Sequence, residues 1–492
     1  MNPLKSLASQ TAIYGVSSIV GRFLNYLLVP LFTYYFSPAE YGVVSEFYAY
    51  MGFFAVLLVF GLETGYFRFR NKDNPDSDIA YATALRFLIS ANVGFFIIIL
   101  FFDRTIASAL QYADHPEYVW WAAAIVTLDS IAAVAFARLR AENKATRFAS
   151  IKIVEIFVTI VLNLFFIIYC REAHSQAPDS LAGRLWDPAI GVGYIFIANL
   201  VGSSIKSVLL LPQLRGVVLG FSRELFGKLI RYSLPMVVIG FAGVINEMLD
   251  RAILKYLLPY DMNTNMQMLG IYSACYKLSI LMSLFIQAFR YAGEPFFFAY
   301  ADKSDAKNVY ANVLNYFVIF CVFIFLFVTL YIDVFKYFIG APFRAGLTIV
   351  PILLLANLFL GIYVNLSVWY KLTDRTMLGA YVAIGGAALT VALNFWWIPI
   401  MGYIGAAWAT LACYASMALA SYLLSRKYYP VPYDVKRITG YIVLGLILYI
   451  SNQQLIAATG IHALFSGTLF LVIYLVIAYV LDAKKLLRFR TA

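Results

Sequence analysis

The chain consists of long apolar runs separated by short polar breaks. Most runs hold about 18 or more residues, and the breaks are rich in charged residues, Gly or Pro. An α-helix needs about 20 mostly apolar residues to cross roughly 30 Å of hydrocarbon. We therefore predict fourteen membrane-spanning helices, at about 11–35, 39–67, 79–102, 117–137, 146–170, 188–211, 226–257, 267–297, 309–332, 346–370, 375–398, 403–425, 438–452 and 460–481.

Composition excludes a water-soluble fold. Of the 492 residues, 62% are hydrophobic and 13% charged, against about 45–50% and 25% in soluble globular proteins. A disordered scaffold is also excluded, because disorder requires low hydrophobicity. The predicted fold class is an all-α polytopic membrane protein.

Basic residues gather in alternate breaks, notably 68–72, 138–147 and 426–437. Because cytoplasmic loops of membrane proteins collect Lys and Arg, this pattern places both termini in the cytoplasm. It also accounts for most of the formal charge of +11, so we expect no nucleic-acid partner.

Nothing in the breaks suggests catalysis. The longest, about 171–187, is too short for a domain, and no Walker A or HExxH sequence occurs. Asp76 and Asp78 have a DxD spacing that more simply marks a helix start. The three histidines, His115, His174 and His462, are far apart in the sequence. The four cysteines lie in or at the end of apolar runs, which is typical of core packing: Cys170, Cys275, Cys321 and Cys413. We therefore expect no enzyme activity, metal site or cofactor.

A weak internal repeat relates two halves of the chain. The segment 41–48 (YGVVSEFY) recurs at 269–276 (LGIYSACY), 228 residues later, and Asn163 recurs as Asn394, 231 residues later. Paired segments are predicted to run in the same direction across the membrane. We therefore predict two six-helix lobes, 1–215 and 216–430, as a parallel repeat about an axis along the membrane normal, followed by two additional helices and a cytoplasmic tail, 431–492. By default, the substrate site lies between the lobes near the midplane.

Ionisable residues inside spans are functional candidates, because a charge in hydrocarbon is unfavourable. Arg22 lies on a polar stripe of the first helix with Tyr14, Ser18 and Asn25. Two interpretations stay open for Arg22. It contacts substrate, or it pairs with a carboxylate such as Glu46 for packing alone.

Two further helices carry charge. In the eighth, Arg290 and Glu294 are spaced to pair or to contact substrate, and Pro295 is expected to disturb the inner end. Lys277 lies about 140° around that helix from Arg290, so the two cannot share one narrow groove. In the seventh, Glu247 lies near Asp250, which is expected to pair with Arg251 or Lys255. The remaining charges are expected to pair or snorkel (Glu63, Arg86, Asp129 and Glu155) or to anchor helix ends (Lys152, Lys206 and Arg231).

Several segments resemble the bacterial oligosaccharide flippases of the multidrug/oligosaccharidyl-lipid/polysaccharide exporter superfamily. The resemblance covers about residues 5 to 430. It is carried by 11–25 (TAIYGVSSIVGRFLN), 36–42 (FSPAEYG), 246–251 (NEMLDR), 269–272 (LGIY), Asn394 and 402–407 (GYIGAA).

The resemblance implies two six-helix lobes in a V around a cavity, lined mainly by helices one, two, seven and eight. It implies undecaprenyl-pyrophosphate-linked oligosaccharide as cargo, moved by alternating access across the bacterial inner membrane for O-antigen, capsule or another surface polysaccharide. Arg22, Asn25, Lys277 and Arg290 are the residues placed to bind this substrate. Coupling to H⁺ or Na⁺ would use Glu46, Glu247 or Glu294. Expected partners are the lipid-linked glycan, membrane lipids and, as a further candidate, polysaccharide assembly proteins.

Other functions fit the same pattern. A lipid II flippase and a small-molecule or drug antiporter share the implied fold, although the former usually has more cavity arginines and the latter typically has twelve helices. A membrane scaffold that recruits glycan-assembly enzymes belongs to a different class. A membrane enzyme fits least, because no catalytic constellation is visible.

Overall fold

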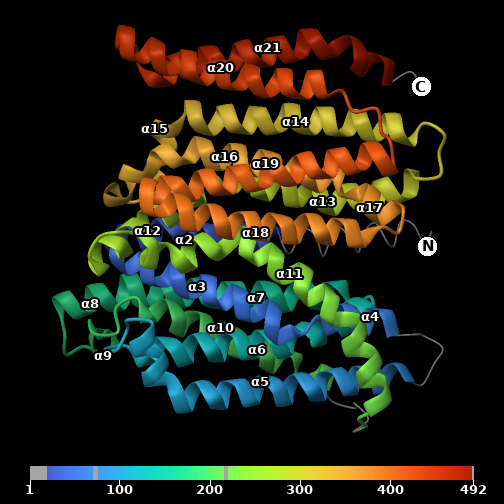
Figure 1. Cartoon of the computed structure of the whole chain (residues 1–492). Helices are drawn as coiled ribbons and strands as arrows, with labels where there is room; N and C mark the ends of the chain where they lie inside the picture. The colour runs from blue at the N-terminus through green and yellow to red at the C-terminus, as the bar shows by residue number, and fades with distance from the viewer. Residues whose placement is uncertain (1–18, 70–75, 215–219, 490–492) are drawn as a thin grey trace. The chain divides into compact units, whose positions relative to one another are not determined.

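The computed structural model describes residues 19–69, 76–214 and 220–489, which are helices and short connections without a β-strand (Figure 1). The chain divides into two compact units: Met1–Tyr256 with Tyr260–Gly270, and Leu257–Pro259 with Ile271–Ala492. This division follows packing and differs from the repeat boundary at 215. The three predicted segments therefore stay a prediction.

The first unit begins, within the described residues, with a helical segment at 19–26. The helices that follow are α2 (Leu28–Tyr35), α3 (Pro38–Val59), α4 (Leu62–Phe69), α5 (Asp76–Ala109), α6 (Pro116–Ala141), α7 (Ala145–Leu164), the π-helix η1 (Phe165–Cys170), α8 (Arg171–Gln176), α9 (Leu181–Arg184), α10 (Gly193–Leu214) and α11 (Arg223–Leu257). The first part of α12 (Met262–Leu278) also belongs to this unit. Helix α6 is central, because it packs against α3, α4, α5, α7 and α10.

The second unit contains the rest of α12, then α13 (Ile280–Tyr300), α14 (Ala306–Leu330), α15 (Ile332–Phe335), the 3₁₀ segments η2 (Lys336–Phe338) and η3 (Ala341–Ile349), α16 (Val350–Leu366), α17 (Val368–Leu372), α18 (Thr376–Met401), α19 (Tyr403–Tyr428), α20 (Val435–Thr459) and α21 (Ala463–Phe489). Helix α19 packs against both α16 and α18, and α14 carries α20 and α21 (Figure 1).

The all-α class is confirmed, and the described residues hold 12 helices long and apolar enough to span a membrane, or 13 when α12 and α13 count as one span. The predicted first span, 11–35, lies partly outside the described residues, so the number fourteen stays a prediction. The predicted eighth helix is bent by 49°. The break is at Ser279, whose Oγ bonds Tyr276 O at 2.7 Å, whereas Pro295 lies inside α13. A hydroxyl that bonds its own preceding turn competes with the helical ladder.

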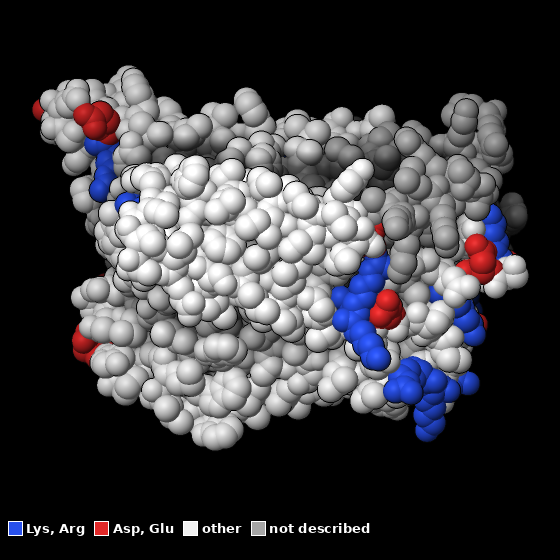
Figure 2. All heavy atoms as spheres, turned by 90° about the horizontal axis from the view of Figure 1, so that it is seen from above, with Lys and Arg blue, Asp and Glu red and all other residues white. Residues whose placement is uncertain are grey.

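Charge is distributed along the final helix pair as membrane insertion requires. Viewed over α20 and α21, a broad uncharged band covers most of the pair, and the charged side chains of its described residues lie at one end (Figure 2). At this end, Arg437 pairs with Asp482, which also accepts a hydrogen bond from Tyr441. Ion pairs at helix ends keep charge out of the hydrocarbon and tie the two helices together.

Equivalent residues of the repeat form the same local structure. Asn163 Nδ2 donates to Thr159 O at 2.7 Å, and Asn394 Nδ2 donates to Thr390 O at 2.8 Å. Both asparagines are completely buried. The two Thr residues have the same 231-residue spacing as the two Asn residues, so the repeat extends to side-chain bonding within α7 and α18.

The start of α3 shows why helices begin where they do. Ser37 Oγ accepts from Glu40 N at 3.4 Å, and Glu40 Oε2 accepts from Ser37 N at 2.8 Å, with Pro38 at the first helical position. This reciprocal capping box satisfies backbone N–H groups that have no intrahelical acceptor.

Removing the cap by Ser37→Ala is expected to cost about 1 kcal/mol of stability. The loss is measured as a lower midpoint of thermal unfolding of the purified protein in detergent. Ser37→Thr, which keeps the hydroxyl, is the matched control. Equal losses for Ala and Thr would contradict the capping role.

Candidate functional site

Glu46 on α3 lies in a fully satisfied, buried ion pair. Lys255 Nζ is 2.7 Å from Glu46 Oε1, and both side chains are 0% exposed. Tyr50 OH also donates to Oε1, and Tyr112 OH donates to Oε2 at 2.5 Å. Lys255 Nζ donates further to Leu110 O at 2.8 Å. The proposed pairing of an arginine with Glu46 is therefore wrong for Arg22, because Lys255 and two tyrosines occupy this carboxylate.

Lys206 on α10 forms a second buried network. Its Nζ is 2.6 Å from Asp129 Oδ1 on α6 and 2.5 Å from Glu155 Oε1 on α7, and Ser203 Oγ donates to Asp129 at 2.7 Å. Asp129 and Glu155 are paired, but their partner is Lys206, which was expected to be an interfacial anchor, and not another residue of the group expected to pair or snorkel. Lys206 is 2% exposed, because three packed helices meet around its ammonium group.

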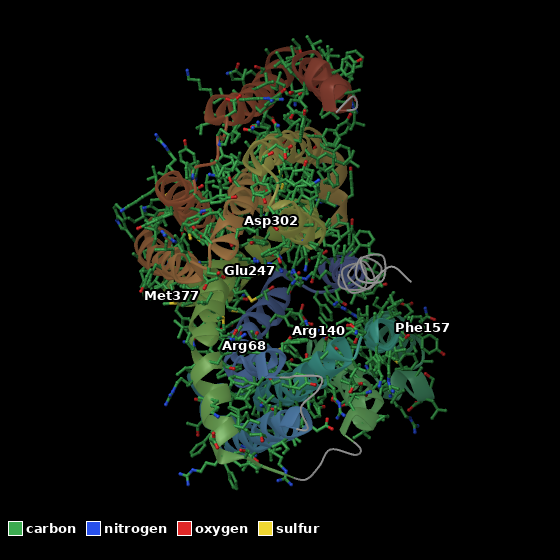
Figure 3. The ribbon with its side chains drawn as sticks, turned by 90° about the vertical axis from the view of Figure 1, so that its right-hand side faces the viewer. Arg68, Arg140, Phe157, Glu247, Asp302 and Met377 are labelled. Atoms are coloured by element: carbon green, nitrogen blue, oxygen red, sulfur yellow. The ribbon has the colours of Figure 1, made fainter. Side chains whose placement is uncertain are left out.

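Glu294 does not pair with Arg290. Its Oε1 is instead 2.6 Å from Lys371 Nζ at the end of α17, and both side chains are partly exposed. Helix α13 packs against α17, so tertiary contact supplies a partner that competes with the neighbour one turn away. A similar contact pairs Arg140 on α6 with Glu63 on α4. Figure 3 views these neighbouring helices end-on and labels Arg140 and Arg68.

Three predicted site residues keep exposed charges. Arg22, Glu247 (labelled in Figure 3) and Arg290 have exposed side chains, and within the described part of the chain none of them forms an ion pair. Asn25 is also exposed, three residues after Arg22. A charge of this kind at mid-membrane costs about 2.5–3.5 kcal/mol unless water or a ligand solvates it.

Lys277 is half-buried in α12 and has interactions of its own. The stripe predicted from Tyr14 and Ser18 lies outside the described residues. On α11, Met236, Gly243 and Glu247 follow spacings of seven and four residues and are all exposed. Glu247 therefore lies on an open face of its helix.

Sequence reasoning missed the role of Lys255. It offered Lys255, with Arg251 as the alternative, as a local partner for Asp250, whereas Lys255 pairs with Glu46. Tyr50 and Tyr112 were not singled out at all. The signal that could have suggested the pair was the position of each residue across the membrane. Glu46 and Lys255 both lie near the outer end of their predicted helices, 39–67 and 226–257.

The described residues offer no group of three or more His, Cys, Asp or Glu side chains that could hold a metal ion. All four cysteines are free and buried, which confirms that they are packing residues. His115 Nδ1 lies 2.8 Å from Glu117 Oε1 in the turn before α6. The candidate site residues that keep exposed charges are the cations Arg22 and Arg290 and the carboxylate Glu247.

The fold is similar to that of known transporters. The lipid II flippase MurJ, in an inward closed conformation, aligns with a TM-score of 0.69 at 15% identity, covering 95% of this chain and 99% of that chain. An inward-facing multidrug resistance MATE family transporter of the MOP superfamily aligns with a TM-score of 0.66 at 14% identity, covering 88% and 95%. A MATE transporter in complex with MaD3S gives 0.61 at 13% identity, covering 90% and 97%.

No curated protein matches the chain by sequence. A family model described as "Polysaccharide biosynthesis protein" matches residues 7–300. The match spans more than half of the chain and includes Arg22, Lys255 and Arg290. It agrees with the flippase resemblance of the sequence and with the fold. This chain is a multi-pass membrane protein that belongs to the polysaccharide biosynthesis protein family.

Proposed function

We propose that the protein is a flippase that moves undecaprenyl-pyrophosphate-linked oligosaccharide across the bacterial inner membrane for surface polysaccharide synthesis. One observation carries the proposal. Arg22, in the helix of residues 19–26, and Arg290, in α13, have exposed guanidinium groups that no described carboxylate neutralises. In a polysaccharide biosynthesis protein with a flippase-like fold, an anionic lipid headgroup is the ligand that such cations suit.

The substrate chemistry follows from these groups. A guanidinium donates two parallel hydrogen bonds to phosphate oxygens, so Arg22 and Arg290 are each suited to bind a phosphate group. Lys277 adds a point charge and Asn25 a neutral donor. The glycan occupies a water-filled path and the isoprenoid stays in lipid, because sugars and charge are strongly disfavoured in hydrocarbon. Alternating access exposes this site first to the cytoplasm and then to the outer side.

Coupling to H⁺ or Na⁺ is assigned to Glu247. Glu46 is neutralised by Lys255 and Glu294 by Lys371, whereas the Glu247 carboxylate is exposed and forms no ion pair with a described residue. A carboxylate whose charge is not already compensated is the better acceptor for a coupling cation.

Partners follow from the cargo. The protein would bind membrane lipids alongside the lipid-linked glycan, with both termini cytoplasmic. Polysaccharide assembly proteins are further candidates. The fold likeness to a lipid II flippase makes lipid II the second candidate substrate.

The test is complementation in bacteria that lack their own oligosaccharide flippase, read as surface glycan. The chain is expected to restore glycan, and a variant with Arg22, Lys277 and Arg290 all replaced by Gln is expected not to, at equal protein level. Normal glycan from the triple variant would favour a scaffold. Rescue of a strain depleted of lipid II flippase, or of drug resistance in a pump-deficient strain, without rescue of glycan, would overturn the proposed cargo.

A further inference from the structure

Two glycines bring α3 and α12 into backbone contact. A Cβ atom at Gly42 would lie 2.4 Å from Met266 O, and a Cβ at Gly270 would lie 1.8 Å from Pro38 O. Real Cβ atoms do not approach other atoms so closely, so only glycine fits at either position. The backbones of the two helices are therefore in direct contact at these glycines.

These contacts are related by the internal repeat. Gly42 and Gly270 are 228 residues apart, and so are Pro38 and Met266. Gly42 faces the carbonyl of Met266, and Gly270 faces the carbonyl of Pro38. Each contact is therefore the repeat equivalent of the other. Contacts exchanged in this way are the mark of a two-fold relation. The crossing of α3 and α12 therefore has local two-fold symmetry.

The Glu46–Lys255 ion pair lies beside this crossing. Glu46 follows Gly42 by four residues on α3, so the two lie on the same face. Tyr112 connects them, since its hydroxyl donates to Glu46 and lies 3.7 Å from Met266 Sδ. The repeat equivalent of Glu46 is Ala274, so the ion pair is present on one side of the crossing only.

We propose that the Glu46–Lys255 pair is the latch of an outer gate, which holds helices of the two repeat halves together in the conformation seen here. This proposal rests on the proposed flippase function. In the predicted orientation α3 begins, α11 ends and α12 begins on the outer side. Opening toward that side separates α3 from α11 and α12, and separates the pair.

A buried ion pair suits such a latch energetically. Coulomb attraction within the pair is largely offset by the loss of hydration, so its net contribution is close to zero, and apolar substitutes are often more stable. The open state regains the hydration of both ions. The closed and open states therefore stay close in free energy, as a gate that cycles requires.

The titratable groups that contact Glu46 and Lys255 come from three elements. Helix α3 supplies Tyr50, the turn before α6 supplies Tyr112, and α11 supplies Lys255 and Tyr256. Tyr50 OH lies 3.3 Å from Tyr256 OH, and the Tyr256 side chain is 46% exposed. The latch thus has one hydroxyl at the surface, where water enters first when the gate opens.

The experiment measures gate opening without substrate. With the four native cysteines replaced by Ala, Ser45→Cys places a near-isosteric thiol on the α3 face that carries Gly42, at a position 8% exposed. A membrane-impermeant maleimide is added to the outer side of spheroplasts. Glu46→Gln, which leaves the Lys255 charge uncompensated when the gate is closed, is expected to raise the labelling rate about tenfold or more. Glu46→Leu with Lys255→Met is expected to lower it below the parent.

Glu155→Gln is the matched control, because it breaks a buried lysine pair within residues 129–206 of the first half and is expected to leave labelling unchanged. Ser273→Cys, the repeat equivalent of Ser45, is a second reporter should the first variant fold poorly. Equal labelling of Glu46→Gln and parent, or an equal rise with Glu155→Gln, would overturn the latch. Since labelling needs no glycan, loss of glycan rescue with the expected labelling pattern would reject only the proposed cargo.

Discussion

Arg22→Ala is expected to abolish surface glycan in flippase-deficient cells while the protein accumulates normally. The guanidinium is exposed and has no ion-pair partner among the described residues, so its loss does not leave a buried carboxylate uncompensated. What is lost is binding. A hydrogen bond to a charged group contributes about 1.5–3 kcal/mol, which corresponds to roughly a tenfold to hundredfold weaker interaction with pyrophosphate.

Arg22→Lys separates charge from geometry. It keeps the positive charge but cannot form the bidentate contact, so intermediate glycan is expected. The measurement is immunoblotting of surface glycan beside membrane-fraction protein. Glycan at the parental level in Arg22→Ala, with parental protein, would remove Arg22 from the substrate site.

Lys206→Met is expected to produce the largest loss of stability, about 3 kcal/mol. It removes the ammonium group that Asp129 and Glu155 share on α6, α7 and α10, and leaves two carboxylates facing each other. The estimate is at the low end for a broken buried pair because Asp129 is 41% exposed and regains water. Thermal unfolding in detergent, followed by size-exclusion chromatography, measures the effect.

The compensated variant identifies the cause. Lys206→Met combined with Asp129→Asn and Glu155→Gln removes all three charges, and most of the lost stability should return. If the triple variant were no more stable than Lys206→Met alone, the loss would come from packing of the lysine stem and not from charge.

Helix positions could be predicted from the sequence because hydrocarbon imposes one rule on every span: about 20 apolar residues that satisfy their own backbone. The span predicted at 39–67 appears as Pro38–Phe69, and that at 403–425 as Tyr403–Tyr428. The bend within 267–297 was assigned to Pro295. It occurs at Ser279 instead, where a side chain bonds the preceding turn, and no periodicity in the sequence reports that choice.

The candidate site was predicted less completely. The sequence identified Arg22, Glu247 and Arg290 as intramembrane charges, and the structure leaves all three without an ion-pair partner among the described residues. It could not identify partners. Glu46 with Lys255 and Glu294 with Lys371 join residues 209 and 77 positions apart, and pattern rules on one helix reach only three or four residues.

The sequence by itself determined that the chain is an all-helical membrane protein and where most of its spans lie, because both depend on hydrophobicity counted along the chain. Tertiary structure alone decided which charges are neutralised and which remain available to a ligand. It also showed that the repeat glycines Gly42 and Gly270 meet. The physical reason is that an ion pair or a helix crossing depends on the rotation and depth of two helices at once, and hydrophobic pattern constrains each helix separately.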